Sequence, residues 1–165
     1  MRKRFAGVLS QRAKKITPEN NNGNVISYKP QDLYQKAKVS ELHRYGRGKF
    51  CRFRIHVDGG LSVVYVVTVG NKAKYVGECQ DLLSRSNSGY GNISPRNCFV
   101  GGKLTNCRIN KAILSMVLSG RSAHLWFHRA KRDERKLLEK RLISRLNPEW
   151  NHNGNEDVAT RSHYK

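Results

Sequence analysis

The chain has 165 residues, enough for one domain, and its 32 Lys and Arg against 12 Asp and Glu give a net charge of +20. No apolar run approaches the ~18 residues that a membrane-spanning helix needs, and the apolar clusters exclude a wholly disordered chain. So large a positive charge favours a polyanionic partner. Nucleic acid fits better than a membrane surface, because no basic amphipathic helix has a wide apolar face to spare.

The N-terminal part is expected to be irregular. Residues 1–24 change from basic to amide-rich and predict an arm with a linker, and residues 30–45 predict one short helix. Residues 50–57 alternate apolar and basic side chains, which predicts a half-buried strand with Arg52 and Arg54 on its outer face.

The central part has the clearest pattern. A β-branched run over 61–69, the turn Gly70-Asn71 and a second strand over 73–76 predict a hairpin that ends at Gly77. A helix is expected over 80–86. The later elements follow in order: a surface loop over 87–104, a helix from Thr105 or Asn106 to 119, a strand over 123–127, the acids Asp133 and Glu134 at a helix N-terminus, a helix over 137–146 and the terminator Pro148.

This order predicts a small α/β sandwich: a central mixed three-stranded sheet flanked by helices, with a basic N-terminal extension. The expected division is an extension over 1–60 that contacts DNA, a main domain over 61–151 and a polar tail over 152–165.

The cysteine spacings indicate less about function. Cys51, Cys79, Cys98 and Cys107 form no C-x-x-C pair, as is typical of a reduced, cytoplasmic protein. The alternative is a zinc site made by Cys98, Cys107 and a histidine, although structural zinc ligands are usually closer in sequence.

Several short motifs stand in a fixed order and contain five candidate site residues: Tyr65, Tyr75, Arg85, Glu139 and Asn151. The motif elements are Val63-Val64-Tyr65, Tyr75-Val76-Gly77, Arg85 eight residues later, and Glu139 followed at +3, +4, +9 and +12 by Leu142, Ile143, Pro148 and Asn151. This ordered set resembles the GIY-YIG nuclease family over roughly residues 61–151.

The resemblance implies a Mg²⁺-dependent DNA endonuclease with one metal ion per site, for which Mn²⁺ can substitute. Tyr65 and Tyr75 would face the active site, and Arg85 would contact the scissile phosphate. Glu139 would hold the metal, and Asn151 would fix local geometry through hydrogen bonds. Taken alone, Glu139 could instead be a solvated helix residue.

The sequence departs from the family pattern at two points. The first motif has Val-Val-Tyr instead of Gly-Ile-Tyr, and Gly89 stands where many members have a histidine four residues after the arginine. The general base is therefore expected to be Tyr75 or Tyr65.

Other side chains are expected to contact double-stranded DNA: Lys74, Tyr90, Arg96, Lys103, Arg108, Arg52 and Arg54. A restriction-type role would imply a homodimer, since one active site cuts one strand at a time. Two alternatives are a catalytically inactive nucleic-acid-binding module on the same fold and a basic RNA-binding protein.

Overall fold

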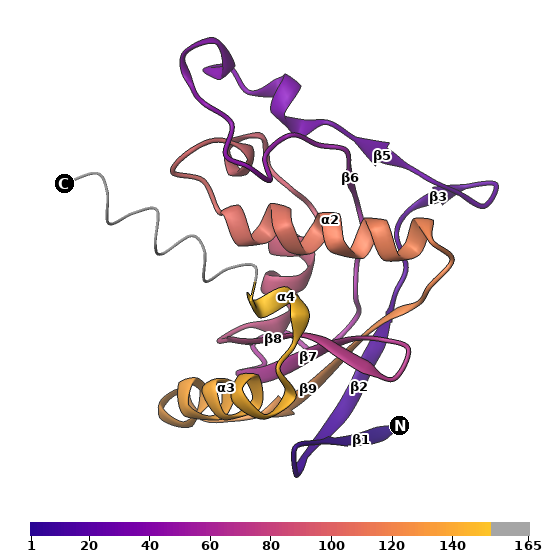
Figure 1. The fold of residues 1–165 in the computed structure, drawn as a ribbon, viewed down its shortest axis with the longest axis vertical. Helices are drawn as coiled ribbons and strands as arrows, with labels where there is room; N and C mark the ends of the chain where they lie inside the picture. Colours follow the sequence, from indigo (N-terminus) through magenta and orange to yellow (C-terminus); the bar gives the residue numbers. More distant parts are fainter. Residues whose placement is uncertain (153–165) are drawn as a thin grey trace. The chain divides into compact units, whose positions relative to one another are not determined.

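The structure is a computed structural model that describes residues 1–152, leaving out the side chains of Arg12, Ala37 and His152. The predicted polar tail therefore lies almost wholly outside the described residues. Helices and strands are mixed and the main sheet is mostly antiparallel, so the prediction of a small α/β fold is confirmed (Figure 1). Among the described residues, no helix is both long and apolar enough to cross a membrane.

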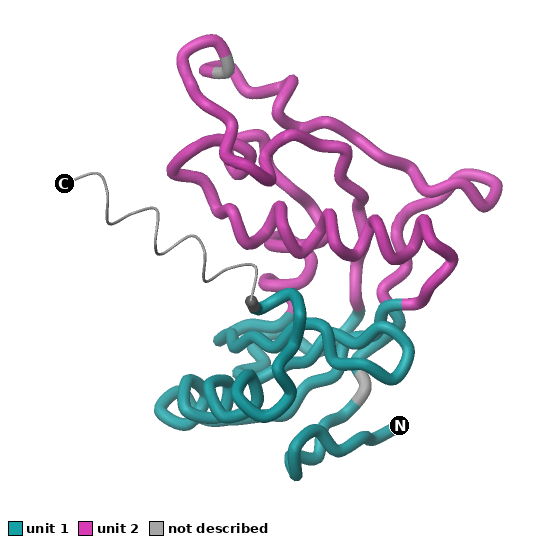
Figure 2. Tube along the Cα trace, viewed as in Figure 1, with its two compact units in different colours: residues 1–15, 56–82, 123–165 teal, residues 16–55, 83–122 magenta. Residues whose placement is uncertain are grey.

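The chain forms two compact units, each assembled from separate segments (Figure 2). Unit 1 comprises residues 1–15, 56–82 and 123–165, and unit 2 comprises residues 16–55 and 83–122. The two units thus alternate along the chain.

Unit 1 contains a five-stranded sheet. Its spatial order is β1 (Arg2–Phe5), β2 (Val8–Ile16), β9 (Ala123–Arg129), β7 (Val63–Val69) and β8 (Lys72–Cys79). β7 is antiparallel to both β8 and β9, so the three strands expected from the sequence are antiparallel to their neighbours and not mixed. The two-residue turn Gly70-Asn71 accounts for the antiparallel pairing of β7 and β8, since such a short connection can join only antiparallel strands. β8 also continues past Gly77, its predicted end.

The N-terminus forms a hairpin, and the prediction of an arm over residues 1–24 was wrong. β1 pairs with β2 around Ala6 and Gly7, whose φ angles of 46° and 89° suit a tight hairpin turn. Phe5 is buried, and its ring meets that of Trp126 edge-on at 5.8 Å. One aromatic side chain thus attaches a basic strand to the sheet, and basic composition alone conceals this.

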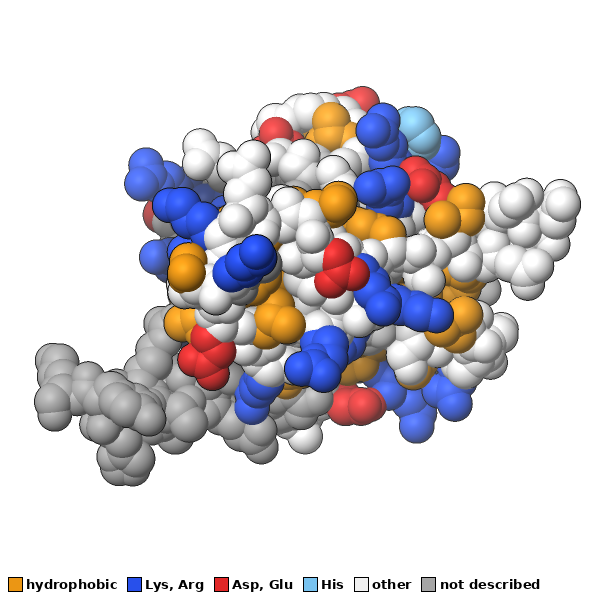
Figure 3. Space-filling view, turned by 90° about the horizontal axis from the view of Figure 1, so that it is seen from above, with side chains coloured by type: hydrophobic (Ala, Val, Ile, Leu, Met, Phe, Trp, Pro, Cys, Tyr) orange, Lys and Arg blue, Asp and Glu red, His pale blue; other side chains and the backbone are white. Residues whose placement is uncertain are grey.

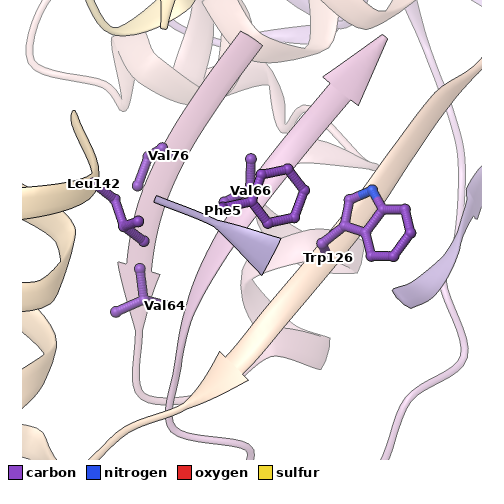
Figure 4. Close-up of a cluster of buried hydrophobic side chains, with 6 residues drawn as sticks. All are labelled: Phe5, Val64, Val66, Val76, Trp126 and Leu142. Carbon is purple, nitrogen blue, oxygen red and sulfur yellow. The ribbon is translucent and has the colours of Figure 1, made fainter. Parts of the chain in front are cut away.

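One face of the sheet is covered by α3 (Arg132–Leu146). Leu142 packs beside Val64 and Val76 (Figure 4), within a cluster that includes Phe5 and Trp126. α3 begins five residues before the predicted start at 137, with Asp133 and Glu134 in its first turn as expected. It ends at a left-handed Asn147, and α4 (Glu149–His152) follows Pro148.

Unit 2 is built from short elements around one long helix. They are β3 (Asn20–Asn21), β4 (Asn24–Val25), β5 (Ser27–Tyr28), η1 (Pro30–Leu33), η2 (Ala37–Val39), β6 (Phe50–Cys51), η3 (Arg85–Tyr90), η4 (Pro95–Cys98) and α2 (Leu104–Leu118), with α1 (Leu82–Ser84) at the junction of the units. The helix expected over 30–45 is two 3₁₀ turns, and the expected loop over 87–104 contains η4 and most of η3. A cluster of Phe50, Ile93, Cys98, Phe99 and Cys107 forms its core.

Candidate functional site

The two motif phenols lie together on one face of the unit 1 sheet. Tyr65 is opposite Gly77 and Tyr75 is opposite Val67, so strand alternation places both side chains on the same face. Their ring centroids are 6.2 Å apart, and the two rings are 1% and 8% exposed. The pair is thus a fixed, largely enclosed element of the sheet.

Gly77 determines where the Tyr65 phenol lies. A Cβ at Gly77 would meet the Tyr65 hydroxyl and would lie 2.6 Å from its Cζ. The ring therefore extends across the backbone of β8 at Gly77. Because β8 is an edge strand, the hydroxyl is carried toward the free edge of the sheet.

Glu139 lies on the side of α3 that contacts β8. Arg135 of α3 pairs with Glu78 of β8 through Nη1 and Oε2 at 3.2 Å, and Leu142 packs beside Val76. Glu139 is four residues after Arg135 and three before Leu142, so helical periodicity places it on the same side of α3. Glu139 is half-buried, and its helix covers the sheet face that carries Val76 and Glu78, which is opposite to the face that carries Tyr65 and Tyr75.

Asn151 binds the free edge of β8. Its Oδ1 accepts a hydrogen bond from the Val76 N–H, and its Nδ2 donates one to the Val76 carbonyl, both at 2.8 Å. Lys74 of β8 forms an ion pair with Glu149 of α4. Side chains of α4 therefore contact the edge of β8 where a neighbouring strand would otherwise pair.

Arg85 lies in unit 2, at the start of the π-helix η3. The turn closes with a hydrogen bond from the Gly91 N–H to the Ser86 carbonyl at 2.7 Å. π-Helices are rare, and they occur frequently at functional sites. The half-buried Arg85 is thus carried by a backbone form that is uncommon in purely structural helices.

An extended segment, residues 51–55, lies against η3 and α2. Asn87 donates to and accepts from the Ile55 backbone, Asn110 does the same with Cys51, and Gly91 accepts from the Phe53 N–H. We call Asn87, Gly91 and Asn110 the amide frame. It holds the segment extended although only β6 is a regular strand, and the predicted alternation of buried and exposed residues is confirmed.

The predicted DNA contacts differ in exposure. Arg52, Arg54, Arg96 and Lys103 are exposed, and the Arg52 guanidinium lies 4.3 Å from the ring centroid of Tyr28. Lys74 is paired with Glu149 and is only 16% exposed. Tyr90 and Arg108, at 2% and 8%, are buried, although Tyr90 was expected on a surface loop and both were expected to contact DNA. Both residues belong to helices, η3 and α2, that bury them.

Charge alone does not locate a binding groove. Residues 83–122 contain six Lys and Arg and no Asp or Glu, so this part of unit 2 is strongly cationic. Even so, Lys and Arg side chains are spread over the whole face shown in Figure 3 and do not gather in one patch.

The cysteines are buried free thiols. Burial raises the pKa of Cys51 to about 12, so its thiol stays protonated at neutral pH. Cys98 and Cys107 pack together, and a hydrogen bond between them lowers the pKa of Cys98 and raises that of Cys107. Among residues 1–152, no three His, Cys, Asp or Glu side chains are grouped as metal ligands.

The amide frame was missed in the sequence, although a pattern for it exists. Asn106 and Asn110 stand four residues apart within the helix that carries Ile109 and Ile113, so helical spacing places amides beside an apolar stripe. Buried amides require hydrogen-bond partners, which is what Asn110 finds in Cys51 and Tyr90.

No match to this chain was found among protein-family models, curated proteins or solved structures. Its function therefore has to be inferred from its own residues.

Proposed function

We propose that this protein is a Mg²⁺-dependent DNA endonuclease of the GIY-YIG type. The observation that carries the proposal is the arrangement around β8. The Tyr65 phenol crosses the strand at Gly77, Glu139 leaves α3 beside the same stretch, and the Asn151 amide binds the strand at Val76. These residues are up to 86 positions apart in the chain, and what they share is the 76–78 stretch of β8, which Tyr65 approaches from one sheet face and α3 from the other.

The donor set suits Mg²⁺. This ion prefers oxygen ligands, keeps several waters and often takes only one or two protein carboxylates, so Glu139 alone is sufficient. A structural zinc ion would need about four ligands, which the described residues do not group. When bound, Mg²⁺ would act as a Lewis acid on the phosphodiester.

The remaining residues have separate tasks. The guanidinium of Arg85 offers a planar pair of donors that matches two phosphate oxygens. Tyr65 or Tyr75 would accept the proton of the attacking water. Asn151 keeps the edge of β8 in position. Arg52, Arg54, Arg96 and Lys103 bind phosphates outside the cleavage point.

The test is cleavage of supercoiled plasmid with Mg²⁺ by the wild type and by Glu139→Gln, which keeps the shape of the side chain and removes its charge. We expect the variant to lose at least about 100-fold in rate, since a metal supplies several kcal/mol of charge stabilisation. Asp133→Asn is the matched control, because it removes an exposed acid from the same helix. Equal cleavage by Glu139→Gln and wild type would contradict the proposal.

A second candidate is a nucleic-acid-binding module without activity, which the absence of a histidine at Gly89 favours. It predicts salt-dependent DNA binding with no cleavage in Mg²⁺ or Mn²⁺. Stronger competition by RNA than by duplex DNA would favour the RNA-binding alternative instead.

A restriction-type enzyme would act as a homodimer. In that case, sedimentation of the protein with a DNA site should show two copies, and both strands should be cut in one encounter.

A further inference from the structure

We infer that Tyr90 is a positioning residue for Arg85. The ring of Tyr90 holds the Arg85 guanidinium against its face. The catalytic consequence of this inference rests on the proposed nuclease function, whereas the contact itself does not.

The register of η3 creates the pair. In an α-helix, residue 85 would face residue 89, but a π-helix has i→i+5 bonding and brings residue 90 over residue 85. The Arg85 Cζ lies 5.9 Å from the ring centroid of Tyr90, within the range of a cation–π contact. Gly89, the residue that an α-helix would place there, contributes no side chain.

The ring is held rigidly. Tyr90 is 2% exposed, its carbonyl accepts a hydrogen bond from Asn110 Nδ2 at 2.7 Å, and the next residue, Gly91, closes the π-turn. Asn110 also binds Cys51, so the amide frame fixes Tyr90 and the 51–55 segment together. The ring is therefore a fixed surface, and the flexible arginine is the partner that becomes ordered against it.

This arrangement suits a phosphate ligand. An arginine side chain has large rotamer freedom, and its planar fork binds two oxygens only in one orientation. A ring against the guanidinium restricts that orientation before substrate arrives. Since a misplacement of about 1 Å can cost about 100-fold in rate, removing the ring should reduce turnover more than affinity.

The experiment compares Tyr90→Phe, Tyr90→Leu and the wild type, with Tyr45→Leu as the matched control. Tyr45 forms a similar pair with Arg44 at 4.8 Å in the same unit, outside η3. Two readouts are used: the NMR resonance of the Arg85 Nε–H group, which an aromatic face shifts upfield, and single-turnover cleavage with the DNA dissociation constant.

We expect Tyr90→Phe to keep the ring-shifted Arg85 resonance and the wild-type rate within about threefold. Tyr90→Leu should lose the shift and about 10-fold or more in rate, with DNA affinity within about threefold. Tyr45→Leu should change neither readout. If Tyr90→Leu does not fold, the test is the Arg85 Nε–H resonance in the wild type and in Tyr90→Phe. An upfield shift in both supports the inference, and no shift in either overturns it.

An unchanged rate in a folded Tyr90→Leu would also overturn it, as would a loss of affinity alone with the Arg85 resonance unmoved. A wild type that never cleaves DNA would refute the proposed function and not the contact, which the resonance of Arg85 tests independently.

Discussion

Among single residues, Gly77 has the clearest effect on the site. Because it has no Cβ, the Tyr65 hydroxyl can lie against its backbone. Gly77 stands directly opposite Tyr65 in the antiparallel pair, and its bare backbone is the surface on which the phenol lies. The glycine of the second motif is thus explained by steric fit to the tyrosine of the first. Two residues that appear independent in the sequence form one packing unit.

Gly77→Ala should therefore disturb the site. The added Cβ would clash with the hydroxyl of a fully buried ring, and overpacking of this kind costs about 1–3 kcal/mol. Urea denaturation measures the loss, and plasmid cleavage should fall with it. Gly59→Ala is the control, because its Cβ would meet nothing within 4 Å. Equal stability of the two variants would contradict this account of Gly77.

Asn151→Ala should also destabilise the protein. The change leaves the Val76 N–H and carbonyl without their side-chain partners, at a cost of about 1–3 kcal/mol. Asn151→Asp, which still accepts but cannot donate, should lie between alanine and wild type in the same denaturation assay. Glu149→Ala breaks an exposed ion pair and should cost under about 1 kcal/mol. A smaller loss for Asn151→Ala than for Glu149→Ala would refute the bidentate role.

At the scale of elements, η3 and the segment 51–55 form one structure. The amide frame accepts hydrogen bonds from the backbone N–H groups of Cys51, Phe53 and Ile55. The alternate residues, Arg52 and Arg54, are exposed. Side-chain amides perform the task of a neighbouring strand. This is why the segment keeps strand alternation beyond β6 without a regular ladder.

Two glycines of this region should respond in opposite ways to alanine. A Cβ at Gly91 would clash with the Phe53 carbonyl and lie 2.9 Å from that of Ser86, so Gly91→Ala should separate η3 from the segment and cost about 1–3 kcal/mol. A Cβ at Gly89 has its nearest contact at 3.7 Å, and alanine there should stabilise the helix by up to about 1 kcal/mol. Thermal denaturation of both variants tests the pair, and a loss of stability in Gly89→Ala would contradict it.

At the scale of the whole molecule, the charge of +20 is shared by both units and sets the salt response. Phosphate contacts release counterions, so log K should fall linearly with log salt concentration. Affinity for duplex DNA, measured with Glu139→Gln to prevent cleavage, should decrease about 10³-fold or more between 50 and 200 mM salt if at least about six phosphates are contacted.

The exposed pair Arg52 and Arg54 should account for part of that slope. Replacing both by alanine should reduce its magnitude by about 2, because each phosphate contact contributes about 0.9. Lys36→Ala with Lys38→Ala removes the same charge from exposed positions of the same unit. An equal change of slope in both double variants would show that the 51–55 segment has no special contact.

Short-range patterns in the sequence predict the local elements and the motif. A β-branched run, a Gly-Asn turn, apolar residues at helical spacing and acids at a helix start are read from neighbouring residues, and β7, β9, α2 and α3 followed from them with errors at their ends. The identities and order of Tyr65, Tyr75, Arg85, Glu139 and Asn151 were also visible there.

Which side chains are buried, and which distant groups they contact, depends on the fold as a whole. It attached the basic N-terminus to the sheet through Phe5, bound the edge of β8 with Asn151, buried Tyr90 and Arg108, and held residues 51–55 extended with distant amides. The physical reason is that periodicity reports contacts a few residues apart. Edge pairing, burial and side-chain hydrogen bonds depend on distant groups. In the pairs Ile55–Asn87, Cys51–Asn110 and Phe5–Trp126, the partners are 32 to 121 positions apart.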